Sequence, residues 1–456
     1  MDTLAPSQLP SYITSATPLG RDKRLPWFKN VAPTYAGIFL WFVFWQDAAQ
    51  APAPGGALGQ GVTWALISLA VAAVVCYILY LVPGLLGSKT GLPLYIVGTS
   101  TFGAQGGFVM PGFLMGVLQF GWLGVNTYFS SLALASVVPV PASILMAVWG
   151  VLAAFVGLKG IQYVARVSTY LPLIPLAILM LLFVNTIGSV GGFAPSTVAA
   201  APGSQGSGLS MFGVLAAVLT YVVGFFATAG AAGVDLAMST RHEKDVQTGG
   251  LVGIVLAILV TAGLAMLIVA GVYGDTGLAA HAAARNAGMN AFNMIPVVLG
   301  EGVARWLMFA LAVAAFPAAC FSAFIAANSF KTTLPQVNPF ISVGIGAAVS
   351  IVLAVTGVAG DVVWVFVIIG ASFGPICGAM MVDYILSGGT WTGPRAGFNP
   401  AGWIAWALGF VVGILPNLGI AMPAAPVAAF IVGAVVYFLC AKSGLLSRVV
   451  PMPAKR

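Results

Sequence analysis

Charged side chains are scarce in this sequence. They make up only 6% of its 456 residues, whereas 60% are hydrophobic, and the mean hydropathy is +1.04. A soluble protein has roughly 25% charged residues, so this composition excludes an ordinary soluble fold. Long apolar runs such as 62–82 can each supply the roughly 20 residues of a membrane-spanning helix. They lack the short alternating pattern of a transmembrane β-barrel. The composition predicts an all-α integral membrane protein.

Histidine and cysteine are scarce as well. The only two histidines, His242 and His281, fall in predicted loops. The four cysteines lie in apolar runs without metal-ligand spacing, which predicts a packing role for them; they are Cys76, Cys320, Cys377 and Cys440. The sequence contains no HExxH pattern of a zinc protease. We therefore expect no enzymatic activity, no cofactor and no metal beyond a possible coupling ion.

Twelve apolar segments, separated by turn residues or charges, are candidates for membrane spans. Their approximate limits are 32–50, 62–86, 106–133, 140–158, 168–189, 209–238, 248–274, 303–330, 338–357, 362–387, 401–419 and 422–441. They form one membrane domain over 31–441. A tail of 1–30 precedes that domain, and a tail of 442–456 follows it.

The basic residues predict the orientation of these spans. With the N-terminus inside, all of the 17 Lys and Arg residues except Arg285 and Arg305 fall in cytoplasmic connections or tails. Cytoplasmic loops are enriched in Lys and Arg, so both termini are expected in the cytoplasm, and the protein in the cytoplasmic membrane. The net charge of +7 reflects this orientation and does not indicate a nucleic-acid partner.

The first and sixth spans do not read as simple helices. The first contains Gln46 and Asp47 and then runs into Pro52 and Pro54; the sixth has three glycines, at 224, 230 and 233. Backbone freed at membrane depth must line a cavity or be covered by protein. Interrupted helices at matching places in two halves indicate a transporter binding site. The alternative is that the glycines only permit close helix packing.

The third span carries a polar stripe. At about 100° per residue, Gln119, Trp122 and Asn126 lie within about 60° of one another on a helix. A flat ring beside an amide suits a planar heterocycle with mixed hydrogen-bond donors and acceptors. A lone amide usually joins neighbouring helices, and a Trp often belongs to the interfacial belt. We expect the packing role for Asn126 and the ligand role for Gln119 and Trp122.

Two acidic residues, Asp47 and Asp235, are expected at membrane depth, where ionisable side chains are functional candidates. An outward vestibule around Asp47 is one alternative. A helix-end position for Asp235, facing the basic loop that begins at Arg241, is the other. Asp383 is expected near the cytoplasmic end of the tenth span in a structural role.

Four motifs, in order along the chain, resemble those of the nucleobase–cation symporters, which include cytosine permeases and a hydantoin transporter. They are GSKTGL (87–92), QFGWLG (119–124), GFFATAG (224–230) and GPICGAMMVDYIL (374–386). The resemblance implies a five-plus-five inverted repeat with broken helices 1 and 6. The repeats would cover about 31–189 and 209–387, followed by two further helices at about 401–441. It also implies alternating access around a midplane site.

The resemblance assigns roles to individual residues of the substrate site. Trp122 would stack on one face of a planar base, Phe226 would cover the other, and Gln119 would hydrogen-bond its edge. Thr228, Gly224 and Gln46 would complete the contacts.

For the coupling ion, the resemblance implies sodium ligation by the carbonyl groups of Phe42 and Trp45. The eighth span departs from the family pattern, because Ala314, Pro317 and Ala318 stand where Ser or Thr hydroxyls are expected. Either Ser322 supplies the missing oxygen, or coupling uses protons or nothing. Asp47 and Asp235 are the candidate proton sites.

The preferred hypothesis is therefore a secondary active transporter that imports a nucleobase, such as cytosine or a purine, or a related planar heterocycle. The alternative within the same fold is a transporter of an amino acid or a quaternary amine. A membrane sensor or channel is a third hypothesis. It is disfavoured because the sequence shows neither a sensory domain nor a charged pore ring.

Overall fold

The computed structural model describes residues 9–50, 56–168, 170–200 and 209–452. Pro52, Pro54, the outer ends of both predicted tails and part of the connection after the fifth span lie outside these residues. The described chain is helical, and its only β-type pairings are two isolated bridges, Leu25 with Thr240 and Arg395 with Val449.

The predicted spans are found as helices. In chain order they are α2 (Val31–Leu40) with α3 (Phe42–Trp45), α4 (Val62–Thr90), α7 (Leu114–Ala135), α8 (Ala142–Lys159), α10 (Leu173–Thr186), α12 (Met211–Ala231) with α13 (Gly233–Ala237), α15 (Ala257–Gly274), α17 (Met294–Thr333), α18 (Pro339–Val355), α19 (Val362–Leu386), α20 (Pro400–Ile414) and α21 (Ala425–Lys442). Among the described residues, ten helices are long and apolar enough to cross a membrane, and α2 and α18 are shorter apolar helices. The protein is therefore a multi-pass, all-α membrane protein, as the composition predicted.

The eighth span starts earlier than the sequence suggested. It was predicted to begin at 303, but α17 starts at Met294 and passes through a kink at Gly300, whose φ is +77°. Glycine adopts positive φ without steric cost, so the helix direction changes there without ending the segment. The charged residue Glu301 masked this first part of the helix in the hydropathy pattern.

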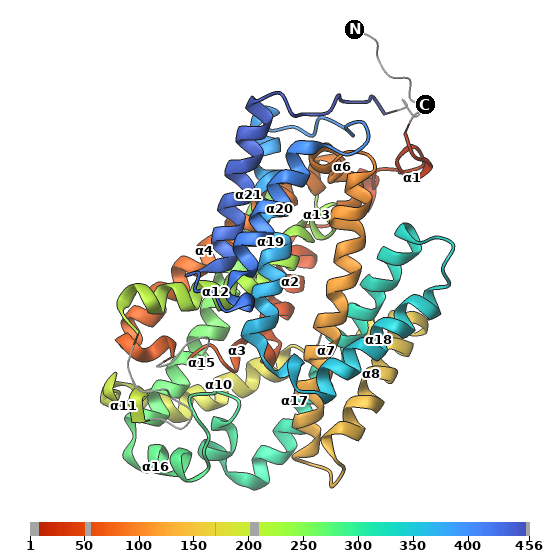
Figure 1. Ribbon diagram of the computed structural model, residues 1–456. Helices are drawn as coiled ribbons and strands as arrows, with labels where there is room; N and C mark the ends of the chain where they lie inside the picture. The colour runs from red at the N-terminus through yellow and green to blue at the C-terminus, as the bar shows by residue number, and fades with distance from the viewer. Residues whose placement is uncertain (1–8, 51–55, 169, 201–208, 453–456) are drawn as a thin grey trace.

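The helices form two groups (Figure 1). One group, on the right in the figure, consists of α7, α8, α17 and α18, which all contact one another. In the other group α4 contacts both α12 and α15, and α2 contacts α15 and α13. The first group holds the third, fourth, eighth and ninth spans, and the second holds the first, second, sixth and seventh. Equivalent members of two five-helix repeats thus fall in the same group, which is what an inverted repeat predicts.

The first span is interrupted. Trp41 has φ −61° and ψ 124°, an extended conformation between α2 and α3, and the chain leaves the helix again at Gln46. A smaller break separates α12 from α13 at Ala232, which keeps a helical conformation. The helix of the first span is therefore interrupted more strongly than the helix of the sixth span.

Glycines in the sixth span serve close packing. A Cβ at Gly224 would lie 2.7 Å from the carbonyl oxygen of Phe366, and one at Gly233 would lie 2.8 Å from the ring of Tyr80. These distances are too short for any side chain, so Gly224 allows α12 to approach α19. The packing interpretation of these two glycines is confirmed.

Residues 9–30 pack across the end of the bundle that the sequence predicts to be cytoplasmic. Leu19 N–H donates to the carbonyl of Gly91 (2.9 Å), Arg24 Nη1 donates to the carbonyl of Ser88 (2.6 Å), and Leu25 N–H donates to the carbonyl of Ser239 (2.7 Å). The hydroxyl of Tyr12 donates to the carbonyl of Ala104. The N-terminal segment thus connects α4 with the chain before α7 and after α13.

Candidate functional site

Trp122 lies where the two helix groups meet. Its ring centroid is 5.2 Å from that of Phe225, 5.6 Å from that of Phe366 and 5.9 Å from that of Trp41. These rings come from α12, from α19 and from the break between α2 and α3. Trp122 is only 8% exposed, so the four rings enclose one another in this conformation. We call Trp41, Trp122, Phe225 and Phe366 the ring cluster.

A hydrogen bond links the two groups inside this cluster. The indole Nε1 of Trp122 donates to Oγ1 of Thr228 at 3.2 Å, and both side chains are buried. The structure therefore brings together two residues that the sequence assigned to one site, from α7 and α12.

Phe226 lies elsewhere. Its side chain is fully buried and stacks on Phe39 with centroids 5.7 Å apart and ring planes at 15°. It also contacts Tyr35 at 5.7 Å. The ring of α12 that contacts Trp122 is Phe225, one residue and about 100° away around the helix. The structure does not bring Phe226 and Trp122 together.

The two amides of the polar stripe on α7 differ in their hydrogen bonds. Gln119 is 6% exposed, and its Nε2 contacts only the weakly accepting Sδ of Met115, at 3.6 Å. Asn126, by contrast, is firmly bonded: it donates to the carbonyl of Ala315 on α17 (2.9 Å) and accepts from Trp149 Nε1 on α8 (3.1 Å). Asn126 joins three helices, so its predicted packing role is confirmed. Gln119 keeps an amide with little bonding of its own.

Gln46 follows the break in the first span. Its backbone carbonyl accepts from Ala291 N–H at 2.7 Å, but its side-chain Nε2 is buried and has no hydrogen-bond partner in the described protein. A buried donor without a partner costs roughly 1–3 kcal/mol. This amide is therefore a natural contact for a bound molecule or water.

The two acidic residues are bonded in ways the sequence did not indicate. Asp47 accepts a hydrogen bond from the side-chain amide of Asn290. Asp235 accepts from the backbone N–H of Leu94 at 2.8 Å, which ties α13 to α5 (Leu94–Val97). Arg241, which we considered as the neighbour of Asp235, pairs with Asp245 instead, at 3.1 Å.

The carbonyl groups predicted to ligate sodium already accept backbone hydrogen bonds. That of Phe42 accepts from Gln46 N–H (2.9 Å), and that of Trp45 accepts from Ala48 N–H (3.3 Å). A carbonyl oxygen has two lone pairs, so both retain acceptor capacity. Ser322, the alternative oxygen ligand, is 9% exposed and lies one turn beyond Ala318 on α17.

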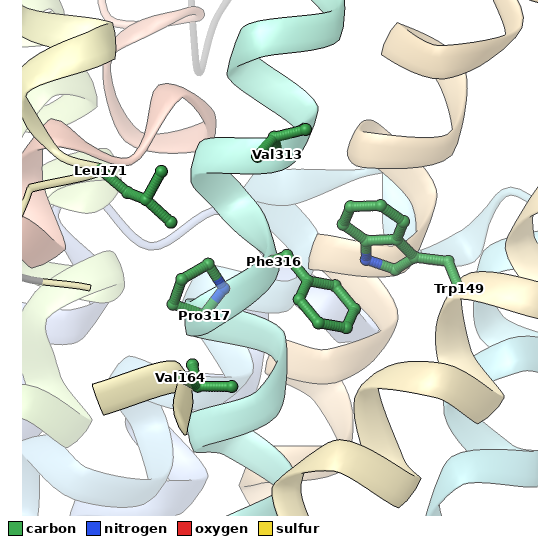
Figure 2. A pocket seen from close by; sticks show the side chains of 6 residues that line it. All are labelled: Trp149, Val164, Leu171, Val313, Phe316 and Pro317. Atoms are coloured by element: carbon green, nitrogen blue, oxygen red, sulfur yellow. The ribbon is translucent and has the colours of Figure 1, made fainter. Parts of the chain in front are cut away.

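The part of α17 where sodium-binding hydroxyls were expected borders an apolar cavity. Figure 2 shows the six side chains that line this cavity of about 260 Å³: Trp149, Val164, Leu171, Val313, Phe316 and Pro317. They come from α8, from α9 (Ile161–Val167), from the turn before α10, and from α17. Pro317, one of the three residues that replace the expected hydroxyls, is thus part of the apolar lining of this cavity. The cavity is separate from the ring cluster.

Sequence reasoning missed three members of the ring cluster and the partner of Asp47. Trp41, Phe225 and Phe366 are ordinary apolar residues in their spans, and Asn290 lies in a connection. Aromatic residues are frequent in this chain. Only the way in which the helices pack around Trp122 distinguishes Trp41, Phe225 and Phe366 from the other aromatic residues. The one available signal was Trp41, next to the interrupted part of the first span.

Comparison with known proteins supports this architecture. No protein-family profile and no curated protein matches the chain. Among solved structures, the inward-facing conformation of Mhp1 superposes with a TM-score of 0.66 at 17% identity, covering 99% of this chain and 97% of that one. Mhp1 in a closed conformation with bromovinylhydantoin bound gives 0.63 at 16% identity, covering 98% of both chains.

A sodium-coupled sialic acid symporter in a substrate-bound outward-open state is also similar. It gives a TM-score of 0.56 at 14% identity and covers 94% of this chain and 92% of that one. These structural neighbours are transporters, not enzymes. At such identities the likeness concerns the fold, and it extends over nearly the whole chain. The family resemblance carried by the four motifs is therefore confirmed at the level of the fold: this chain has the fold of Mhp1, a nucleobase-cation-symport-1 family transporter.

Proposed function

We propose that this protein is a cation-coupled secondary transporter that imports a nucleobase or a related planar heterocycle by alternating access. The observation that carries the proposal is the pairing of Trp122 with Gln119 on one buried face of α7. Trp122 on that face contacts Trp41 in the interrupted first span. Gln46, five residues further along the same span, has a buried side-chain nitrogen without a partner in the described protein.

The ring cluster supplies the affinity in this proposal. A planar ligand would enter between Trp122 and Phe225, replacing their edge contact with two stacking contacts. Phe225 takes the place first given to Phe226, because it is the ring of α12 that contacts Trp122. Stacking of a base on an aromatic ring is worth roughly 1–3 kcal/mol. The amides of Gln119 and Gln46 would supply selectivity, because leaving a buried polar group unpaired costs a similar amount.

Alternating access follows from the two helix groups. Trp122 belongs to the group with α7, whereas Trp41 and Phe225 belong to the group with α2 and α12. Movement of one group against the other would separate these rings and break the bond from Trp122 to Thr228. The site would then open without any change within a helix, as expected for transporters that rock around a fixed midplane site.

We place the protein in the cytoplasmic membrane with both termini in the cytoplasm. The support is that the basic N-terminal segment packs beside Ser88 and Gly91, which flank Lys89, and beside Ser239, just before Arg241. The basic residues of three separate connections thus gather at one end of the bundle, as the positive-inside rule requires of a cytoplasmic face.

A second candidate substrate is a quaternary amine. Three aromatic rings from three other chain segments pack around Trp122, and aromatic clusters recognise quaternary ammonium groups through cation–π attraction. The amides of Gln119 and Gln46 favour the heterocycle, because a quaternary ammonium group has neither an N–H donor nor a lone pair to bond with them. Competition between heterocycles and quaternary amines for uptake distinguishes these two substrate classes.

We expect cells that express this protein to accumulate a radiolabelled planar heterocycle. The screen compares cytosine, uracil, purines, hydantoins and allantoin with betaine and amino acids, using cells with an empty vector as the control. Uptake should be saturable, should proceed against the gradient, and should be inhibited by unlabelled heterocycles in excess. Inhibition by betaine or by amino acids, but not by heterocycles, would select the second candidate. Uptake that never exceeds equilibrium would indicate a channel.

We expect this uptake to depend only weakly on sodium. Sodium is a hard cation that requires oxygen ligands, and Ala314, Pro317 and Ala318 offer no side-chain oxygen. Uptake is measured with external sodium and with potassium in its place, together with the Ser322→Ala variant. Comparable rates in both salts and in the variant are the expected result. A steep sodium requirement that Ser322→Ala abolishes would show that Ser322 completes a sodium site. Asp47 and Asp235 remain the proton-site candidates, which Asp→Asn substitutions test.

A further inference from the structure

The cavity beside α17 has no role in the proposed transport site. It is bordered by α8, α9, the turn before α10 and α17, and its lining consists of apolar side chains (Figure 2). Val313 is 38% exposed, so the cavity reaches the surface of the protein. On the same helix of this wall, α8, Val151 and Phe155 are 58% and 57% exposed. Such apolar exposure on a membrane-spanning helix marks contact with lipid.

Three cations stand at the ends of the helices that form the cavity. They are Lys159 at the end of α8, Arg166 on α9 and Lys331 near the end of α17, and all three are exposed. No ion pair involves any of them among the described residues. The sequence has no Asp or Glu between 48 and 234, or between 302 and 360. The chain segments that carry these three cations therefore contain no acidic residue.

Along their helices, the two lysines lie about as far from the cavity as one leaflet of a bilayer is thick. Lys159 follows Trp149 by ten residues on one helix, which is about 15 Å at 1.5 Å per residue. Lys331 follows Pro317 on the same face of α17, at about 21 Å. The hydrocarbon core of a bilayer is about 30 Å thick, so one leaflet is about 15 Å. Arg166 is only two residues from Val164 in the cavity wall.

From this arrangement we infer a binding site for an anionic phospholipid of the inner leaflet. One acyl chain lies in the cavity between Trp149, Val313 and Phe316, and the phosphate head group lies among Lys159, Arg166 and Lys331. The apolar cavity alone would accept any acyl chain. The three cations, of which Lys159 also lies over the Phe340 ring (5.0 Å to its centroid), select a negative head group.

The site is connected to α7 by one hydrogen bond. Trp149, in the cavity wall, donates to Asn126, which also bonds Ala315 of α17. Asn126 lies one turn from Trp122 on the same helix. A chain in the cavity would hold the Trp149 ring and thereby keep α7, α8 and α17 together. The lipid thus stabilises the helix group as a rigid unit.

The test is lipid binding to the purified full-length protein in detergent, followed by native mass spectrometry. Phosphatidylglycerol and phosphatidylcholine with identical chains are the probes. We expect phosphatidylglycerol to bind about tenfold more tightly or better, because each cation near a membrane surface adds attraction to a negative head group. The triple variant Lys159→Gln, Arg166→Gln, Lys331→Gln should lose that preference. Val313→Trp, which fills the cavity, should weaken the binding of both lipids.

A matched control removes equal charge elsewhere: the triple variant Lys244→Gln, Lys442→Gln, Arg448→Gln should bind phosphatidylglycerol like the unmodified protein. If Val313→Trp does not give a monodisperse protein, Val164→Trp fills the cavity from the opposite wall. Equal binding of the two lipids would overturn the proposal. So would equal losses in the two triple variants, or unchanged binding when the cavity is filled. None of these measurements requires transport, so failure of the proposed substrate would leave the result intact.

Discussion

Replacing Arg395 by Gln is expected to lower the free energy of unfolding by roughly 3–5 kcal/mol, the loss seen when one partner of a buried ion pair is removed. Arg395 Nη2 lies 3.1 Å from Asp383 Oδ1, and the two side chains are only 8% and 6% exposed. Arg395 also donates from Nε to the carbonyl of Ser100 (2.8 Å) and from Nη1 to that of Ser447 (3.2 Å). Its removal would leave the buried carboxylate of Asp383 and the carbonyl groups of Ser100 and Ser447 with fewer partners.

The position of this pair explains why its loss should be felt widely. Asp383 lies in the last turn of α19 and also accepts from the hydroxyl of Tyr437 on α21, at 2.7 Å. Arg395 lies in the connection to α20 and reaches the short helix before α7 through Ser100. One charge pair thus joins the ends of α19 and α21 to the segment that leads into α7. This agrees with the structural role expected for Asp383 from the sequence.

Thermal unfolding of the purified protein, measured for a double-mutant cycle of Arg395→Gln and Asp383→Asn, tests this prediction. The double variant should lose less stability than the sum of the single variants, because the two charges act as a unit. Glu243→Gln is the control: its 3.4 Å ion pair with Lys89 is exposed, and such pairs contribute about 0–1 kcal/mol. Additive effects, or an Arg395→Gln variant as stable as the control, would contradict the role of the pair.

The sequence was sufficient for the spans and for the polar stripe because both follow from local rules. Hydropathy locates helices wherever a run is apolar for long enough, and helical periodicity places Gln119 and Trp122 on one face. The same rules failed at 294–302, where Glu301 hid the start of α17. The kink at Gly300 depends on backbone conformation, which hydropathy does not record.

The composition of the ring cluster could not be predicted, because it depends on how helices are rotated against one another. Phe225 and Phe226 are adjacent and chemically identical, and only the close approach of Gly224 to Phe366 fixes which one turns toward α7. Once that contact sets the rotation of α12, Phe225 meets Trp122 and Phe226 meets Phe39. The family motif GFFATAG named the right helix but could not distinguish the two rings.

The resemblance assigned Gln46 to the site, and this assignment stays a prediction. In the structure the Gln46 side chain is buried, and its Nε2 has no hydrogen-bond partner in the described protein. The orientation inferred from the cations of the N-terminal segment stays a prediction. Their contacts with Ser88 and Ser239 were invisible, because they join residues far apart in sequence.

Replacing Trp122 by Ala is expected to reduce the rate of uptake at low substrate concentration by roughly 5- to 150-fold, the loss that corresponds to 1–3 kcal/mol of stacking. The variant also removes the hydrogen bond to Thr228, so a second substitution must separate the two effects. Trp122→Phe keeps a flat ring but has no N–H, and it should retain most of the uptake if stacking dominates. Thr228→Val removes the acceptor of the same bond and should resemble Trp122→Phe.

The matched control is Trp306→Ala, because Trp306 is 76% exposed on the outside of α17. Its loss should leave uptake unchanged when the amounts of protein in the membrane are equal. The decisive comparison is the apparent KM for the heterocycle found in the screen. Loss of stacking raises KM in Trp122→Ala, whereas a merely structural role would lower the amount of active protein and leave KM as it is. If Trp122→Ala altered neither KM nor uptake, the ring cluster would not be the substrate site. That result would not affect the fold or the proposed lipid site.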